Sequence, residues 1–72
     1  MRYKTGTRVR MGACGLHTGK EGVVIPPRLD ARGYPVTSGN DHPFRFRTGR
    51  DVMVKTDRGD VICHLLRCVS RA

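Results

Sequence analysis

Arginine alternates with apolar residues at two places in the chain, in a pattern that favours phosphate binding. Residues 8–11 read Arg-Val-Arg-Met and residues 44–47 read Phe-Arg-Phe-Arg. Alternate side chains of an extended strand point to opposite faces, so each segment is expected to bury its apolar residues and expose its arginines. The planar guanidinium group donates paired hydrogen bonds to phosphate. The two segments and their neighbouring turns therefore predict a nucleic-acid interface made of Arg8, Arg10, Lys20, Arg45, Arg47 and Arg50.

A second contact surface is expected in the long segment 26–43, which contains all four prolines of the chain. Proline restricts strand and helix formation, so the segment is predicted to be a loop with at most a short strand at residues 34–37. Loops of this length within small domains are usually functional or mobile. Arg28, Arg32 and Tyr34 are the candidate contacts here, and a flexible connector is the alternative interpretation.

Two groups of residues could together supply soft metal ligands: Cys14 with His17, and Cys63 with His64 and Cys68. Their spacing lacks the two Cys-x-x-Cys pairs of a zinc ribbon, and cysteine is also among the residues most often buried in a core. Nucleophilic catalysis needs a nucleophile, a base and an orienting group, and the sequence shows no such set. We therefore expect no metal site, no cofactor and no enzymatic activity.

The charge balance of the chain favours an anionic partner. Fourteen Lys and Arg residues, eleven of them Arg, oppose six Asp and Glu residues, and the net charge is +8. A domain this basic is typical of nucleic-acid-binding proteins, and RNA or a ribonucleoprotein is the favoured partner. With few aromatic residues available for stacking, we expect recognition of shape and backbone more than of sequence.

The expected location of the protein is the cytoplasm. The first ten residues lack the apolar core of a signal peptide, and no run of residues is long and apolar enough for a membrane span. Three cysteines are an odd number, which argues against a closed disulfide framework and for reduced thiols. No membrane partner is expected, and the sequence leaves the oligomeric state open.

The elements that must position these side chains are short strands. Residues 1–72 predict a single all-β domain with a polar lead-in at residues 1–6. Apolar alternation or β-branched residues predict strands at residues 7–11, 23–25, 44–47, 52–56 and 61–64. Residues 65–69 form either one helical turn followed by a short strand or a continuous strand. About five strands and no substantial α-helix favour a small closed or nearly closed β-barrel.

The turn between the first two strands supplies a family resemblance. The pattern Gly15-x-x-x-Gly19-Lys20-x-Gly22-x-Val24, preceded by a basic strand, resembles the KOW motif of ribosomal and transcription-elongation proteins. Residues 52–69 look like the closing hairpin of SH3-like and Tudor-like barrels. The resemblance implies an SH3-like barrel that binds RNA or ribosomal and polymerase partners through this turn and the adjacent strand faces.

Two other functions compete with nucleic-acid binding. Segment 26–43 would serve a protein-binding adaptor in the way that related barrels use their long loop to receive a peptide. The order of strands, with Gly-Tyr-Pro-Val at residues 33–36, is also loosely similar to type II dihydrofolate reductases, which work as tetramers around a shared pore. The hairpin strand here reads Val-Ile-Cys-His at residues 61–64 and lacks their pore-lining Gln-Ile-Tyr run, so no catalytic residue is carried over.

Overall fold

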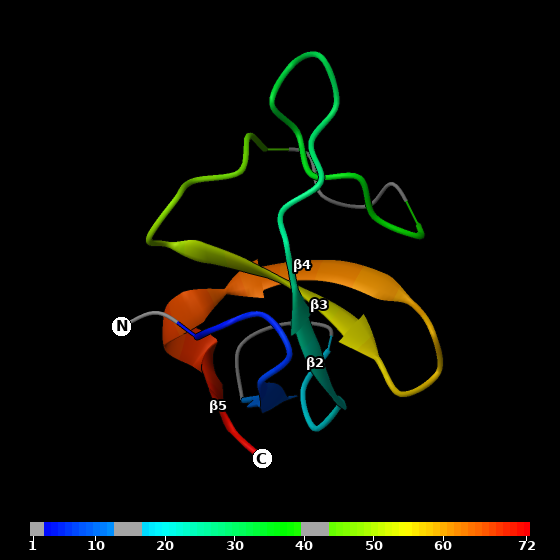
Figure 1. Ribbon diagram of the computed structural model, residues 1–72, viewed down its shortest axis with the longest axis vertical. Helices are drawn as coiled ribbons and strands as arrows, with labels where there is room; N and C mark the ends of the chain where they lie inside the picture. Colours follow the sequence, from blue (N-terminus) through cyan, green and yellow to red (C-terminus); the bar gives the residue numbers. More distant parts are fainter. Residues whose placement is uncertain (1–2, 13–16, 40–43) are drawn as a thin grey trace.

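Five short strands form one antiparallel sheet (Figure 1). The computed structural model describes residues 3–12, 17–39 and 44–72, and its strands are β1 (Arg8–Met11), β2 (Glu21–Ile25), β3 (Asp51–Thr56), β4 (Val61–Leu65) and β5 (Val69–Arg71). One 3₁₀ turn, η1 (Leu66–Cys68), leads into β5. The described residues contain no α-helix, which confirms the all-β prediction. No helix within these ranges is long and apolar enough to cross a lipid bilayer.

The inner face of the sheet carries the core. Val9 and Met11 of β1 are 0% and 1% exposed, while Arg8 and Arg10 between them are exposed, so the predicted alternation of this strand is confirmed. Val24 of β2 lies opposite Val54 of β3, and both are buried. The core cluster is aliphatic throughout and consists of Val9, Met11, Val24, Val52, Val54, Ile62, Leu66 and Val69.

The outer face of the sheet is covered where β3 and β4 pair. Met53 and Cys63 lie opposite each other on this face, yet they are only 1% and 8% exposed. The segment after β2 lies over them, because the backbone N–H of Arg28 donates to Met53 Sδ at 3.2 Å and Ser38 is hydrogen-bonded to Val61. Burial on both sides of the strand explains why β3 shows no clean alternation.

The sheet is open in its hydrogen bonding. Its strand order is β4-β3-β2-β1-β5, so β4 and β5 form the two edges and η1 joins them. The expected closure into a barrel is therefore not formed by strand pairing. Of the two alternatives for residues 65–69, the helical turn followed by a short strand is correct.

Two glycines of the motif-like segment are needed for different reasons. Gly19 has a φ of +85°, a conformation that favours glycine in the turn before β2. Gly22 lies within β2, and a Cβ there would collide with the carbonyl oxygen of Lys55 and come within 2.8 Å of Thr56 Cα. The first glycine therefore allows a turn, and the second allows β2 and β3 to approach closely.

The strand expected at residues 44–47 is not formed, so that prediction is wrong. Phe44 is 65% exposed, and the segment runs outside the sheet (Figure 1). Its middle is attached to the preceding loop, because the N–H of Phe46 donates to the carbonyl oxygen of Gly33 at 2.9 Å, and its end belongs to the following turn, because the carbonyl oxygen of Arg47 accepts from the N–H groups of Arg50 and Asp51. Local alternation is therefore not enough to make a strand, because this segment lies against the hairpin and pairs with neither of the two sheet edges.

Candidate functional site

A groove runs between the turn at residues 47–50 and the η1–β5 segment. The two walls are joined by a hydrogen bond of 2.8 Å from the N–H of Leu66 to the carbonyl oxygen of Arg50. The groove has a volume of about 860 Å³. Among the described residues that line it, three are arginines and none is acidic; they are Tyr3, Arg47, Gly49, Arg50, Leu65, Leu66, Arg67, Val69 and Ser70.

Arg47 is held in the groove wall by a buried carboxylate. The side chain of Asp51 is 1% exposed and that of Arg47 is 48% exposed. Asp51 Oδ2 accepts hydrogen bonds from the backbone N–H of Arg47 at 2.9 Å and from its Nε at 3.3 Å, while Oδ1 accepts from Nη2 at 3.3 Å. Asp51 therefore fixes the orientation of this guanidinium group and compensates its charge.

The other two arginines of the groove carry uncompensated charge. Arg50 is exposed at the end of the turn, and Arg67 is the exposed middle residue of η1, between buried Leu66 and Cys68. Neither makes an ion pair with any part of the chain that the structure describes. Two guanidinium groups thus line one groove without a carboxylate partner.

Tyr3 and Ser70 complete the groove on the side of β5. The hydroxyl of Tyr3 donates to the carbonyl oxygen of Val69 at 3.0 Å, and its ring packs against the core cluster. Ser70 pairs with Arg10 across the β1–β5 ladder. Opposite residues of neighbouring strands lie about 5 Å apart at Cβ, so Arg10 is a neighbour of Ser70, although it does not itself line the groove.

Arg8, in contrast, is engaged by two acidic residues. Its Nη1 and Nη2 donate to the two carboxylate oxygens of Asp57 at 3.1 and 3.0 Å, and Nη2 also lies 3.3 Å from Glu21 Oε1. These hydrogen bonds, above all the one to Asp57, raise the pKa of Arg8 and lower the pKa of Asp57. The charge of Arg8 is compensated by its own sheet, which leaves it poorly suited to phosphate.

The remaining residues predicted to contact nucleic acid are distributed over other parts of the molecule. Lys20 lies in the turn before β2, with Nζ 3.4 Å from His17 Nδ1, and does not line the groove. Arg45 is exposed in the segment that was expected to be a strand. The structure thus brings Arg47 and Arg50 together in one groove, leaves Arg10 outside its lining, and does not unite the two predicted arginine stripes on adjacent strands.

The predicted loop contacts lie on a projecting hairpin, residues 28–36 (Figure 1). The N–H of Val36 donates to the carbonyl oxygen of Arg28, and that of Asp30 to the carbonyl oxygen of Tyr34, both at 2.8 Å. The guanidinium carbon of Arg32 lies 4.5 Å from the centre of the Tyr34 ring, at cation–π distance. The first part of segment 26–43 is therefore ordered by its own hydrogen bonds, and residues 40–43 lie outside the described ranges.

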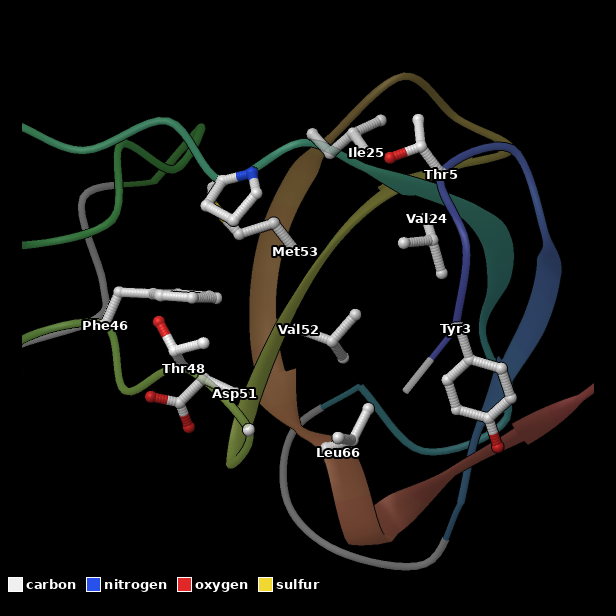
Figure 2. Close-up of a pocket in the computed structure, with 12 residues that line it drawn as sticks. Tyr3, Thr5, Val24, Ile25, Phe46, Thr48, Asp51, Val52, Met53 and Leu66 are labelled. Atoms are coloured by element: carbon white, nitrogen blue, oxygen red, sulfur yellow. The ribbon is translucent and has the colours of Figure 1, made fainter. Parts of the chain in front are cut away.

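A second, smaller cavity lies at the start of β3 (Figure 2). Its volume is about 180 Å³, and its walls are mainly aliphatic. Figure 2 shows Val52, Tyr3 and Leu66 on one side of the strand and Phe46, Thr48 and Asp51 on the other. Pockets for small molecules usually measure about 300–1,000 Å³, so we assign this cavity no ligand.

The cysteines and histidines do not assemble into a metal centre within the described ranges, which contain no group of three or more suitable ligands. Cys68 is disulfide-bonded, so the expectation of reduced thiols is wrong for this residue. Cys63 is buried and is not part of a disulfide. Cys14 lies outside the described residues. His17 and His64 meet edge to face, with ring centres 6.2 Å apart.

Sequence reasoning missed Arg67 and Tyr3, which line the groove with the predicted arginines. A signal for Arg67 was present, because it is the only charged residue in the apolar run at residues 65–69 and therefore has to face solvent. Tyr3 fell within the segment interpreted as a polar lead-in. Its place beside β5 depends on a contact across 66 positions of the chain, which no local pattern indicates.

Comparisons with protein-family models, with curated proteins and with solved structures find no match for this chain.

Proposed function

We propose that this chain is a small, basic, non-enzymatic binding module for nucleic acid, with RNA or a ribonucleoprotein as the favoured partner. The observation that carries the proposal is the groove lined by Arg47, Arg50 and Arg67, in which two arginines have no carboxylate partner among the described residues. The net charge of +8 supports it, because a positive field attracts polyanions from a distance.

The groove would act mainly on the phosphate backbone. Arg50 and Arg67 present free guanidinium forks, and Arg47 is already oriented by Asp51, so less side-chain freedom is lost when a phosphate binds. Contacts with phosphate set affinity and position without reading sequence. We therefore expect strong salt dependence and weak sequence preference.

The KOW resemblance of residues 15–24 supports the same proposal. Among the described residues of this segment, Gly19 forms the turn and Gly22 allows close pairing of β2 with β3. The structure shifts the expected contact surface, because Arg8 is compensated while Arg50 and Arg67 are not. In our proposal the motif maintains the sheet, and the groove beside η1 provides the main contact.

The proposal is tested by titrating fluorescent single-stranded RNA, duplex RNA and duplex DNA at low salt. The double variant Arg50→Ser/Arg67→Ser removes both free charges from the groove and is expected to weaken binding at least about tenfold. The matched control Lys55→Ser/Arg58→Ser removes two charges from the β3–β4 hairpin and should retain most of the affinity. No binding by the wild type, or equal losses in the two double variants, would contradict the proposal.

A protein-binding adaptor is a second candidate, favoured by exposed apolar side chains on and after the hairpin. Leu29, Val36 and Phe44 are 45%, 40% and 65% exposed. Clusters of exposed apolar groups are typical of protein-binding surfaces. A pull-down from nuclease-treated extract that recovers one protein, and loses it when residues 28–33 are replaced, would favour this function over nucleic-acid binding.

A cytoplasmic location belongs to the same proposal, and the disulfide at Cys68 provides a way to test it. Disulfides form in oxidising compartments and are rare in the cytosol. Because Cys68 is buried, its state is measured by acid-quenching cells, alkylating thiols with a maleimide in denaturant, and analysing the protein by mass spectrometry. A labelled Cys68 supports the cytoplasm, whereas an unlabelled one places the protein in an oxidising environment.

A further inference from the structure

The tip of the hairpin holds a preformed stack of an arginine and an aromatic ring. Arg32 lies over the Tyr34 ring at 4.5 Å, and the side chain of Arg32 remains 72% exposed. One face of the guanidinium group is thus occupied by the ring, and most of the side chain is open to solvent. Planar guanidinium groups and aromatic rings are the surfaces on which unpaired bases stack.

Asp30 makes this stack rigid. Its Oδ1 accepts hydrogen bonds from the backbone N–H groups of Arg32 at 2.8 Å and Tyr34 at 3.0 Å, and its Oδ2 lies 3.3 Å from Arg32 Nη2. The backbone hydrogen bond from Tyr34 also helps to lower the pKa of Asp30, which keeps the carboxylate charged. Because Gly33 supplies the positive φ that the turn requires, the tip is ordered before any ligand binds.

The hairpin tip is connected to the groove by the segment that follows it. The side chain of Arg45 lies beside Gly33, where a Cβ would be 3.9 Å from Arg45 Cγ and Cδ, and the N–H of Phe46 donates to the carbonyl oxygen of Gly33. From there the chain descends to the start of β3 (Figure 1) and reaches the groove at Arg47. Exposed arginines therefore occur along one path from the tip to η1: Arg32, Arg45, Arg47, Arg50 and Arg67.

We infer that this path is a binding track for single-stranded nucleic acid, in which an unpaired base stacks on the Arg32–Tyr34 pair while the backbone phosphates follow the arginines to the groove. The inference rests on the proposed function and specifies its ligand. In a duplex the bases are already stacked and paired, so they cannot reach a platform at the end of a hairpin. Groove arginines alone would bind single strands and duplexes through the same phosphates.

The test compares single-stranded RNA and DNA oligomers of about ten nucleotides with duplexes of the same length, a size typical of single-strand binding sites. The wild type is expected to prefer the single strands. Tyr34→Ser should weaken single-strand binding by about 5- to 100-fold, and Arg32→Lys should weaken it while keeping the charge. Neither substitution should change duplex affinity by more than about twofold, because both leave the groove intact.

Two controls separate stacking from charge and from folding. Tyr34→Phe keeps the ring and should bind as the wild type does, and Arg28→Lys makes the same exchange as Arg32→Lys elsewhere on the hairpin. An oligomer containing 2-aminopurine should lose fluorescence on binding the wild type but not Tyr34→Ser. Equal affinity for single strands and duplexes, unaffected by Tyr34→Ser and Arg32→Lys, would overturn the inference and leave the proposed function standing. No binding to any of these nucleic acids would overturn the proposed function.

Discussion

Asp51 binds Arg47 through three hydrogen bonds from a carboxylate that is almost fully buried, while the guanidinium group it holds stays half exposed at the groove. The pair spans four positions of the chain and fixes the turn at residues 47–50 together with the N–H of Arg50, which donates to the carbonyl oxygen of Arg47. One carboxylate therefore maintains both the backbone turn and the direction of a surface charge.

Replacing Asp51 is expected to destabilise the fold. In Asp51→Asn, one carboxylate oxygen becomes an amide NH₂ group, which cannot accept from Arg47, and a buried polar group is left unsatisfied. We expect a loss of about 1–3 kcal/mol in the free energy of unfolding, measured by urea denaturation. Asp60→Asn makes the same charge change at an exposed turn residue and should cost little. Equal losses of unfolding free energy in the two variants would show that the Asp51–Arg47 hydrogen bonds do not stabilise the fold.

The salt dependence of RNA binding should report how many phosphates the arginine path contacts. Three contacts, from Arg45, Arg50 and Arg67, which make no ion pair among the described residues, predict a slope of log K against log salt of about −2.1 for a single strand. Arg50→Ser/Arg67→Ser should reduce the slope by about 1.4. Arg8→Ser should leave it unchanged, because Asp57 and Glu21 already compensate Arg8. A smaller slope in Arg8→Ser would place Arg8 among the phosphate contacts.

Gly19 and Gly22 should respond differently to substitution. Gly19→Ala is expected to cost about 1–2 kcal/mol through its positive φ, and Gly19→Asn should recover part of this, because asparagine tolerates that conformation. Gly22→Ala should cost about 1–3 kcal/mol by forcing β2 away from β3, and Gly22→Asn should be no better. Urea midpoints of the four variants test this, and recovery by Asn at position 22 would contradict the close strand contact.

His64 should make the fold less stable below neutral pH. Burial lowers the pKa of His64 from its usual value of 6.5, and nearby His17 lowers it further. Its buried Nε2 makes no hydrogen bond within the described structure. As pH falls through 6.5, His64 of the unfolded chain binds a proton, whereas His64 of the folded chain stays neutral. The free energy of unfolding is therefore fully retained above this pH and decreases below it, until the pH reaches the lower pKa of His64 in the folded protein.

Melting temperatures between pH 7.5 and 5.5 measure this loss. His64→Phe should make stability nearly independent of pH in this range, because phenylalanine has no proton to take up. His17→Gln should make the loss smaller, because it removes a nearby group that lowers the pKa of His64. Asp30 and Asp57 should not contribute to a change in stability between pH 7.5 and 5.5, because the pKa of each is lowered from 3.8 and lies below this range. An unchanged pH profile in His64→Phe would assign the effect to other groups.

The sequence predicts the sheet well because the information that specifies it is local. Val9 and Met11 alternate with arginine, β-branched residues mark β2, and glycine turns separate the later strands, so β1, β2, β3 and β4 were each placed within two residues of their positions. β5 begins only at Val69, the last residue of the segment in which a closing strand was considered. Residues 44–47 show the same alternation and form no strand. Whether an alternating segment pairs depends on where the rest of the chain places it relative to a sheet edge, which is a property of the whole fold.

The candidate site could be predicted only in part, for the same reason. Arg47, Arg50, Arg32 and Tyr34 were identified from their types and positions, and they lie on the hairpin or in the groove wall. The positive charge of Arg8 is compensated by Asp57, which is 49 positions away in the chain. Arg67 becomes part of the groove only because η1 lies beside the turn at residues 47–50. Long-range pairing of charges, more than residue type, decides which arginines remain available.

The hydrogen bonds of Ser38 also bear on self-association. Its N–H donates to the carbonyl oxygen of Val61 at 2.9 Å, and its hydroxyl accepts from the N–H of Val61 at 2.7 Å. These are polar groups on the free side of β4, where a strand from another copy would otherwise pair. A single serine at the end of the long segment thus blocks part of one edge against extension of the sheet. In the proposed complex, where several copies would bind along one nucleic acid, such blocking would discourage aggregation at high local concentration.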